Sequence, residues 1–250
     1  MVRSINFNVE FDAGRHSRAK IGFVLLATEQ TIEDDMYHLL PDEVGIHFTR
    51  APIPDSITAE TLTNLAASLG DAAALLLPDG SLDVITYACT SGSLVVGEER
   101  VFEELSKGAP AATKTCLITS VMRALKAIDA KRIVVATPYL DEINQMEKEY
   151  MESRGFEILD IQGLQLEKDS EMIRVTPDCI MRFAESLDRP DADAIFISCG
   201  ALRSIDIIDA LERRTGKPVI TSNQAMAWDV MRLAGINDTF QGYGTLLKDY

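Results

Sequence analysis

Two cysteines in this 250-residue chain each follow a short apolar run and precede small polar or glycine residues. The first belongs to Cys89-Thr90-Ser91-Gly92-Ser93 and the second to Cys199-Gly200-Ala201. Two facing thiols suit proton transfer at a carbon next to a carboxylate, because one thiolate can remove a proton while the other thiol protonates the opposite face. Alternatively, one thiolate adds to a double bond, permits rotation and is expelled. Cys89 and Cys199 are therefore the candidate catalytic residues.

Either reaction needs donors that stabilise negative charge on the carboxylate oxygens. Thr90 and Ser91 offer hydroxyl groups, and Gly200 and Ala201 offer backbone N–H groups at the start of the segment after the second thiol. A helix N-terminus also lowers the pKa of a thiol, so we expect a neutral thiol or its thiolate to be accessible near neutral pH without histidine. The three histidines lie in the first fifth of the chain, which argues against a Cys-His pair.

Tyr139 and Gln30 complete the candidate site. Tyr139 follows an Ala-Thr-Pro turn, where its phenol could either donate to a carboxylate or pack in the core. Gln30 is its counterpart when Thr28 is paired with Thr137, and its amide could either reach the ligand or begin a helix. Cys116 and Cys179 lie among apolar residues and are expected in the core.

Parallel strands must position these residues at their carboxyl ends, where open sheets bind ligands. Short apolar runs predict buried strands, and longer segments between them have apolar residues at helical spacing. The strands are predicted over 21–27, 84–88, 133–136, 194–198 and 218–221. The helices are predicted over 58–69, 97–106, 121–128, 140–154, 177–187, 204–214 and 225–233. Alternating strands and helices indicate the α/β class.

An internal repeat indicates two similar α/β halves. Asp83 to Cys89 aligns with Asp193 to Cys199, Ala27-Thr28 aligns with Ala136-Thr137, and Ile118-Thr119-Ser120 aligns with Ile220-Thr221-Ser222. Unrelated strands of common composition are the alternative. If the halves are related, their strand ends face one another across a cleft. Residues 1–18 precede the repeat and are expected to form an arm, either an edge strand or a subunit contact.

Composition narrows the function classes. The 39 acidic and 24 basic residues give a formal net charge of −15, which argues against a nucleic-acid partner. We expect no membrane span, no secretory signal and a cytoplasmic location, where the four cysteines stay reduced. Neither a metal site nor a dinucleotide or P-loop phosphate motif is found in the sequence pattern.

Longer motifs resemble the aspartate/glutamate racemase superfamily, in particular its maleate isomerase and arylmalonate decarboxylase branch. They are Tyr87-Ala-Cys-Thr-Ser-Gly-Ser, the Ala-Thr-Pro-Tyr139 turn, Phe196-Ile-Ser-Cys-Gly-Ala-Leu-Arg and Lys217-Pro-Val-Ile-Thr-Ser-Asn-Gln. Leu26-Ala-Thr-Glu-Gln-Thr is most similar to the ectoine-utilisation protein A group.

The resemblance implies two flavodoxin-like parallel-sheet halves related by a pseudo-two-fold axis, with the active site between them. One half comprises residues 1–119 plus 222–250, and the other comprises 120–221. Cofactor-free chemistry and a homo-oligomer are also implied. Cys89 and Cys199 match the catalytic cysteines, and Thr90, Ser91 and Tyr139 match carboxylate-binding positions.

Two departures bear on the reaction. The decarboxylases of this branch keep only the second cysteine, so the pair favours an isomerase or racemase. Maleate isomerases carry asparagine at the position assigned to Gln30, which argues against maleate itself as substrate. The sequence therefore predicts a cofactor-independent isomerase or racemase of a small carboxylate, either an amino-acid derivative or a dicarboxylate. A malonate-type decarboxylase with Cys199 as proton donor and a non-catalytic carboxylate-binding protein are the alternatives. Loops 49–57 and 162–172 are expected to wall the pocket.

Overall fold

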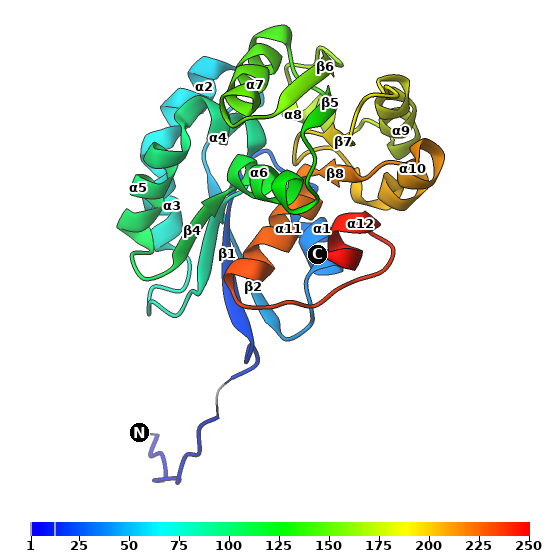
Figure 1. The fold of residues 1–250 in the computed structure, drawn as a ribbon. Helices are drawn as coiled ribbons and strands as arrows, with labels where there is room; N and C mark the ends of the chain where they lie inside the picture. The colour runs from blue at the N-terminus through cyan, green and yellow to red at the C-terminus, as the bar shows by residue number, and fades with distance from the viewer. Residues whose placement is uncertain (1, 13) are drawn as a thin grey trace.

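A computed structural model describes residues 2–12 and 14–250. Two four-stranded parallel sheets form its centre, with strand orders β2-β1-β3-β4 and β6-β5-β7-β8 (Figure 1). The first sheet contains β1 (Ala19–Leu26), β2 (Val44–Ala51), β3 (Val84–Tyr87) and β4 (Thr113–Cys116). The second contains β5 (Arg132–Thr137), β6 (Glu157–Gly163), β7 (Ala194–Ile197) and β8 (Val219–Thr221). The repeated order confirms the α/β class and two flavodoxin-like halves.

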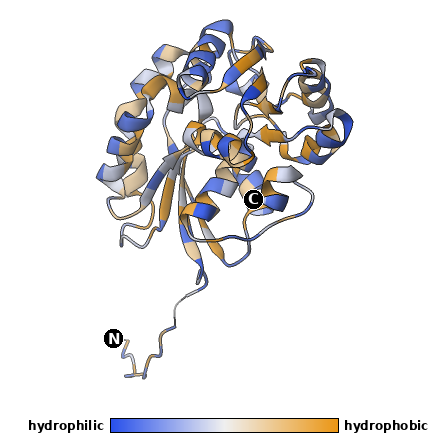
Figure 2. Cartoon of the chain, viewed as in Figure 1, coloured by the Kyte–Doolittle hydropathy of each residue, from blue (hydrophilic) through white to orange (hydrophobic). Residues whose placement is uncertain are grey.

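Helices cover both faces of the first sheet. The helices α3 (Leu69–Ala74) and α5 (Glu98–Gly108) pack on one face, and α1 (Ile32–Leu39), α6 (Leu117–Ala127) and α11 (Ser222–Leu233) pack on the other. The remaining helices are α2 (Ala59–Leu65), α4 (Thr90–Val96), α7 (Asp141–Ser153), α8 (Asp169–Met172), α9 (Pro177–Ser186), α10 (Ile208–Thr215) and α12 (Gly244–Asp249), with 3₁₀ turns at Ala66–Ser68 and Ile205–Ile207. Hydrophobic residues gather on the strands and inner helix faces, as burial of a continuous core requires (Figure 2).

Equivalent aspartates begin the third strand of each half. Asp83 accepts a hydrogen bond from the backbone N–H of Lys20 at 2.8 Å, and Asp193 accepts one from the N–H of Arg132 at 2.8 Å. Each carboxylate thus ties the start of one central strand to the start of its neighbour. The repeat of Asp83 to Cys89 with Asp193 to Cys199 is therefore also a repeat in three dimensions.

Three strands, β2, β4 and β6, lie outside the predicted set, and all three are edge strands. An edge strand is partly solvated and needs no continuous apolar run. His47 and Arg50 interrupt β2, and β4 reads Thr-Lys-Thr-Cys. The five predicted strands are all present. Four of them are central and buried on both faces, which explains the continuous apolar runs that predicted them.

The helix starts correct one of the repeat matches. Helix α6 begins at Leu117, so Thr119 lies in its first turn, whereas Thr221 ends β8 and caps α11. Their surroundings are therefore not equivalent. The Thr221 side chain accepts a hydrogen bond from Gln224 N–H, and the Gln224 side-chain oxygen accepts one from Thr221 N–H, which fixes the start of α11.

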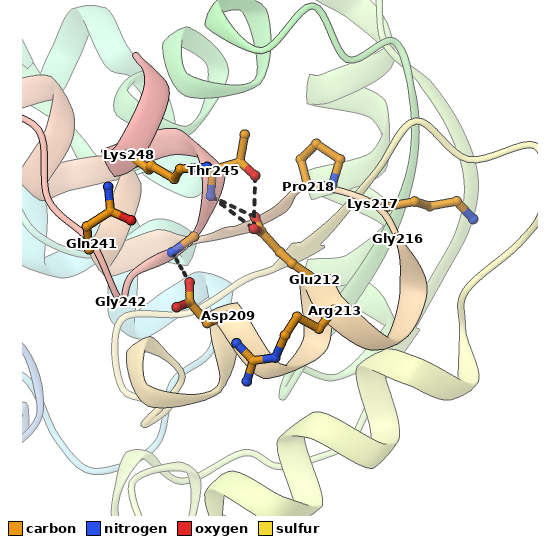
Figure 3. Close-up of a pocket in the computed structure, with 11 residues that line it drawn as sticks. Asp209, Glu212, Arg213, Gly216, Lys217, Pro218, Gln241, Gly242, Thr245 and Lys248 are labelled. Atoms are coloured by element: carbon orange, nitrogen blue, oxygen red, sulfur yellow. Dashed lines mark hydrogen bonds between the residues drawn. The ribbon is translucent and has the colours of Figure 1, made fainter.

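The C-terminal segment spans both halves. Helix α11 packs on α6 and reaches β3 and β4, while α12 contacts α10 and β8. A cavity of about 470 Å³ lies between α10 and α12, where Glu212 accepts hydrogen bonds from Thr245 and Asp209 accepts one from Gly244 (Figure 3). The boundaries 1–119 plus 222–250 and 120–221 stay a prediction.

The N-terminal arm extends away from the body of the molecule (Figure 1). Its alternate residues Ile5, Phe7, Val9 and Phe11 are exposed. Whether the arm makes a subunit contact stays a prediction, and Met1 and Ala13 lie outside the described residues. None of the helices in the described parts of the chain has the length and apolar character that crossing a membrane requires.

Candidate active site

Both candidate cysteines lie just beyond the carboxyl ends of equivalent central strands and line one cavity. Cys89 follows β3 after Ala88, and Cys199 follows β7 after Ser198. The cavity has a volume of about 20 Å³, close to the space that one water molecule needs. Its walls consist of Leu26, Glu29, Ile32, Ile57, Ala88, Cys89, Thr90, Ser91, Tyr139, Asp169, Met172, Cys199, Gly200 and Ala201.

Cys89 is the N-cap residue of α4. Its Sγ accepts a hydrogen bond from Gly92 N–H at 3.2 Å and lies 3.7 Å from Ser91 Oγ. Position 92 requires glycine, because a Cβ there would lie 2.2 Å from the hydroxyl oxygen of the buried Tyr87. The Tyr87 side chain thus sets how closely the start of α4 approaches β3.

Cys199 has a backbone φ of +100°, a region that side-chain-bearing residues rarely occupy. Its N–H donates to Ser222 Oγ at 3.0 Å, and the phenol of Tyr139 lies beside its thiol. Such strain persists only where the surroundings enforce it and is common at functional sites. The hydrogen bond to Ser222 is one of the contacts that enforce it.

Ser222 connects the two cysteine segments. Its Oγ lies 3.0 Å from Thr90 Oγ1 in addition to its bond with Cys199 N–H. The hydroxyl of Thr90 is therefore occupied within the protein. Within the described part of the chain Ser91 makes no hydrogen bond to the Cys199 segment, and its Oγ remains beside Cys89 in the cavity wall.

Two side chains hold the turn after Cys199. Asn223 Nδ2 donates to Gly200 O at 2.8 Å and to Asp35 Oδ2 at 2.7 Å, and Thr31 Oγ1 donates to Ala201 O at 3.0 Å. With both carbonyl oxygens held in this way, the turn places Gly200 and Ala201 in the cavity wall, as the motif analysis anticipated.

Burial, rather than the helix N-terminus, has the largest effect on the pKa of each thiol. It raises the pKa of Cys89 to about 11, although the bonds from Gly92 and Ser91 oppose the rise. Burial raises the pKa of Cys199 further still, with the charge of Asp169 adding to the effect and the Tyr139 phenol opposing it. Of the two expected states, the neutral thiol is the one favoured in the ligand-free protein, because the helix N-terminus does not offset the effect of burial on either pKa. Both thiols are protonated there.

The structure does not place Gln30 at the cavity. Gln30 is exposed and lines a separate hollow with Asp34 and Arg203, whereas its neighbour Glu29 lines the thiol cavity. The strand register explains the displacement. Val24 lies opposite Tyr87, and Ala136 lies opposite Ile197.

Tyr87 and Ile197 each stand two residues before a cysteine, so Val24 and Ala136 are the equivalent positions. Thr137 therefore corresponds to Leu25 and not to Thr28. The match of Ala27-Thr28 with Ala136-Thr137 is therefore out of register. Because Gln30 is paired with Tyr139 only through that match, its assignment to the site is wrong as well. Gln30 therefore gives no reason to exclude maleate as the substrate.

Two buried acidic residues of the cavity, Glu29 and Asp169, were missed by sequence reasoning. Glu29 accepts hydrogen bonds from the N–H groups of Thr31 and Ile32 at 2.7–3.0 Å, and Asp169 accepts one from Thr28 Oγ1 at 2.6 Å. Burial raises the pKa of Glu29 to about 7 and raises the pKa of Asp169. The only sequence signal was their place: Glu29 follows the first strand, and Asp169 lies in a loop already expected to wall the pocket.

Loops 49–57 and 162–172 meet over the cavity. Ile57 N–H donates to Glu167 O at 2.9 Å and Asp169 N–H donates to Asp55 O at 3.0 Å, while the Asp55 carboxylate accepts from Ser170. Ile57 and Met172 form apolar parts of the wall. The expectation that loops 49–57 and 162–172 shape the pocket is confirmed. Among the described residues, no group of three or more His, Cys, Asp and Glu is arranged to hold a metal ion.

Comparison with known proteins gives relatives of consistent kind. A maleate isomerase of Nocardia farcinica (strain IFM 10152) is 29% identical over 241 residues, covering 92% of this chain and 95% of that protein. An arylmalonate decarboxylase of Bordetella bronchiseptica is 33% identical over 141 residues, covering 54% of this chain and 58% of that protein.

A solved structure has a closely similar fold. It is a cysteine-to-serine variant of the Nocardia farcinica maleate cis-trans isomerase with a covalently bound succinylcysteine intermediate. It aligns with a TM-score of 0.84 at 26% identity over 93% of this chain and 99% of that one. The narrower resemblance to the ectoine-utilisation group stays a prediction. The profile of the arylmalonate decarboxylase family matches residues 42–247, and the chain belongs to that family, in the branch that also holds the maleate isomerases.

Proposed function

We propose that the protein is a cofactor-independent isomerase or racemase of a small carboxylate. The observation that carries the proposal is the pair of thiols, Cys89 and Cys199, at equivalent strand ends in the wall of one small cavity. A charge on Cys89 would raise the pKa of Cys199, as expected for two thiols in the wall of one cavity. A substrate carbon between them would meet one sulfur on each side.

The acidity of the two thiols supports an assignment of their roles. Each thiol has donors, Gly92 N–H and Ser91 Oγ at Cys89 and the Tyr139 phenol and Ala201 N–H at Cys199, but the pKa of Cys89 is raised less than that of Cys199, which favours Cys89 as the thiolate. We assign Cys89 as the base or nucleophile and Cys199 as the acid. In racemisation, the Cys89 thiolate takes the proton from the substrate carbon and the Cys199 thiol gives a proton to the opposite face. The reverse direction exchanges these roles.

Donors around the thiols would hold the carboxylate of the substrate. The Ser91 hydroxyl, the Tyr139 phenol and the N–H groups of the Gly200-Ala201 turn belong to the wall. Burial raises the pKa of Tyr139 well above its ordinary value, so the phenol stays protonated and can donate. Negative charge that develops on the carboxylate oxygens during proton removal is stabilised by such fixed donors.

The comparisons support a cysteine with nucleophilic capacity. The Nocardia farcinica relative carries a covalently bound succinylcysteine intermediate. Addition of the Cys89 thiolate to a double bond, rotation about the resulting single bond and expulsion of the thiolate would give cis-trans isomerisation by the same pair of residues. Racemisation and cis-trans isomerisation thus share one site and differ in the substrate.

Substrate-dependent deuterium uptake from D₂O tests the proposal. We expect Cys89→Ala and Cys199→Ala each to lower exchange or isomerisation at least about 10³-fold, in the range typical for loss of an acid or base. Cys116→Ala and Cys179→Ala are matched controls, since neither residue lines the cavity, and both should keep the activity. Near-normal turnover in either of the first two variants disproves the two-thiol reaction.

Decarboxylation of a disubstituted malonate is the second candidate, because the family profile that matches is that of arylmalonate decarboxylase. Cys199 would then protonate the enediolate that remains after loss of carbon dioxide, and Cys89 would be dispensable. In D₂O a decarboxylase labels only its product, whereas a racemase labels returned substrate. Binding without exchange, isomerisation or carbon dioxide release would instead identify a carboxylate-binding protein.

A further inference from the structure

The charges around the thiol cavity are arranged for a ligand with a positive group. Two acidic side chains line it, Glu29 with 4% and Asp169 with 3% of its surface exposed. Among the described residues of the wall, none is Arg, Lys or His. A dicarboxylate would place its second negative charge in a low-dielectric space with two carboxylates and no counter-charge.

Asp169 has an oxygen to offer. Thr28 Oγ1 donates to its Oδ2 at 2.6 Å, and no hydrogen-bond donor among residues 2–12 and 14–250 reaches its Oδ1. The backbone of Asp169 is fixed at the first residue of α8 by the bond from its N–H to Asp55 O at 3.0 Å. Oδ1 is not among the fully buried oxygens without a partner, so it keeps accessible surface, and Asp169 lines the cavity. A donor group of a bound ligand can therefore reach this free acceptor.

Glu29 plays a different part. Its two oxygens already accept from the first N–H groups of α1, so it adds negative potential without a vacant acceptor directed at the ligand. The charges of Glu29 and Asp169 act on each other. A cation beside Asp169 would relieve this repulsion.

The same cation would prepare the thiols. The negative charge of Asp169 raises the pKa of Cys89 and of Cys199. A positive nitrogen paired with Asp169 cancels that charge and lowers the pKa of both thiols. Substrate binding would therefore shift both thiols toward the thiolate, while burial remains the largest cause of their raised pKa values.

We propose that Asp169 binds a cationic nitrogen of the substrate and that the substrate is a small amino carboxylate, not a dicarboxylate. Its carboxylate contacts Ser91, Tyr139 and the Gly200-Ala201 turn, and its ammonium group contacts Asp169 Oδ1. The inference rests on the proposed function, because it assigns the substrate class of that same cavity.

Binding of matched small ligands tests the inference directly. The probes are the two enantiomers of alanine, propionate, which lacks the ammonium group, and malonate, which carries a second carboxylate, supplemented by a panel of larger amino acids and dicarboxylates. Calorimetry with the wild-type chain should give at least tenfold tighter binding for the preferred amino carboxylate than for its deaminated analogue or a dicarboxylate of equal size.

Variants locate the effect. Asp169→Asn should weaken amino-carboxylate binding at least tenfold and leave the deaminated analogue unchanged. Asp34→Asn removes an equal charge from an exposed position outside the cavity and should change neither. Thr28→Val removes the hydrogen bond to Asp169 but keeps the charge, so the preference for amino compounds should persist. The wild-type comparison stands even if Asp169→Asn is unstable.

The inference is overturned if no amino carboxylate binds, if a dicarboxylate binds more tightly, or if Asp169→Asn leaves the preference intact. Deuterium exchange on the same samples separates this from the reaction. An amino carboxylate that binds through Asp169 without exchange disproves the two-thiol reaction only. A dicarboxylate that is isomerised by both wild-type and Asp169→Asn protein supports the reaction and disproves the inference.

Discussion

The backbone of Cys199 permits a quantitative test of how the site is held, because its φ of +100° carries strain that glycine does not feel. A residue in such a conformation costs about 1–3 kcal/mol. Cys199→Gly removes this cost, and Cys199→Ala keeps it. Glycine in turn loses about 0.8 kcal/mol for the missing carbon and about 0.4–1 kcal/mol through the freer unfolded chain. The stability of the glycine variant relative to the alanine variant should therefore lie between about −0.8 and about +1.8 kcal/mol.

Cys89 supplies the matched control, because its φ of −144° is ordinary extended backbone. No strain is relieved there, so glycine should be less stable than alanine by about 1–2 kcal/mol. The preference of an N-cap for glycine over alanine returns a few tenths of that. The glycine-minus-alanine differences at the two cysteines should thus differ by at least about 1 kcal/mol.

Urea unfolding of the four variants, followed by circular dichroism at one pH without ligand, gives the two differences. In a chain of this size, about 1 kcal/mol corresponds to a shift of about 2–4 °C in melting temperature, which offers a second readout. If glycine is as unfavourable relative to alanine at position 199 as at position 89, the backbone at Cys199 is not strained and the account given above is wrong.

Three further predictions concern burial around the site. Burial raises the pKa of Glu147 to about 7 in the folded state, so folding takes up a proton between about pH 4.5 and 7 and stability falls as the pH rises through that window. Glu147→Gln should leave the free energy of unfolding unchanged at pH 5 and raise it by up to about 3 kcal/mol at pH 8. An equal effect at both pH values would contradict this expectation. Alkylation of Cys89 by iodoacetamide, followed by mass spectrometry, should be slow at pH 7 and accelerate up to about pH 11; fast labelling at neutral pH without ligand would show that its thiol is not desolvated. Gly92→Ala should lower the free energy of unfolding by about 1–3 kcal/mol and displace Cys89, because the added Cβ would lie 2.2 Å from the Tyr87 hydroxyl oxygen. Adding Tyr87→Phe removes that oxygen and should restore part of the lost stability. If the double variant is no more stable than Gly92→Ala alone, the steric conflict lies elsewhere.

The central strands could be read from the sequence because burial on both faces demands continuous apolar residues. Those in β1, β3, β5 and β7 are nearly all apolar, and the chemistry-bearing residues follow them directly. The edge strands β2, β4 and β6 follow a weaker pattern, since water competes for one side of each. Sequence therefore predicts the centre of each half better than its margins.

The candidate site divides in the same way. The thiols, Ser91, Tyr139 and the Gly200-Ala201 turn stand at strand ends, where parallel topology brings them together. Asp169 reaches the cavity only because backbone hydrogen bonds join its loop to Asp55, a contact between residues 114 positions apart that no local pattern reveals. To predict that Glu29 lines the cavity, one needs the register between β1 and β3, and the repeated residues alone do not determine that register.

Ser222 touches the segments of both sulfur atoms at once, and this limits how the molecule can open. Separating the Cys89 and Cys199 segments would break its bond to Thr90 or to Cys199 N–H and would change the geometry that catalysis needs. Moving the apposed loops that carry Ile57 and Met172 would break the backbone bonds between these loops and the bond from Thr28 to Asp169, but none of the bonds of Ser222. Ligand traffic should accordingly pass between these loops while the bonds of Ser222 keep the spacing of the two cysteine segments constant through every turnover.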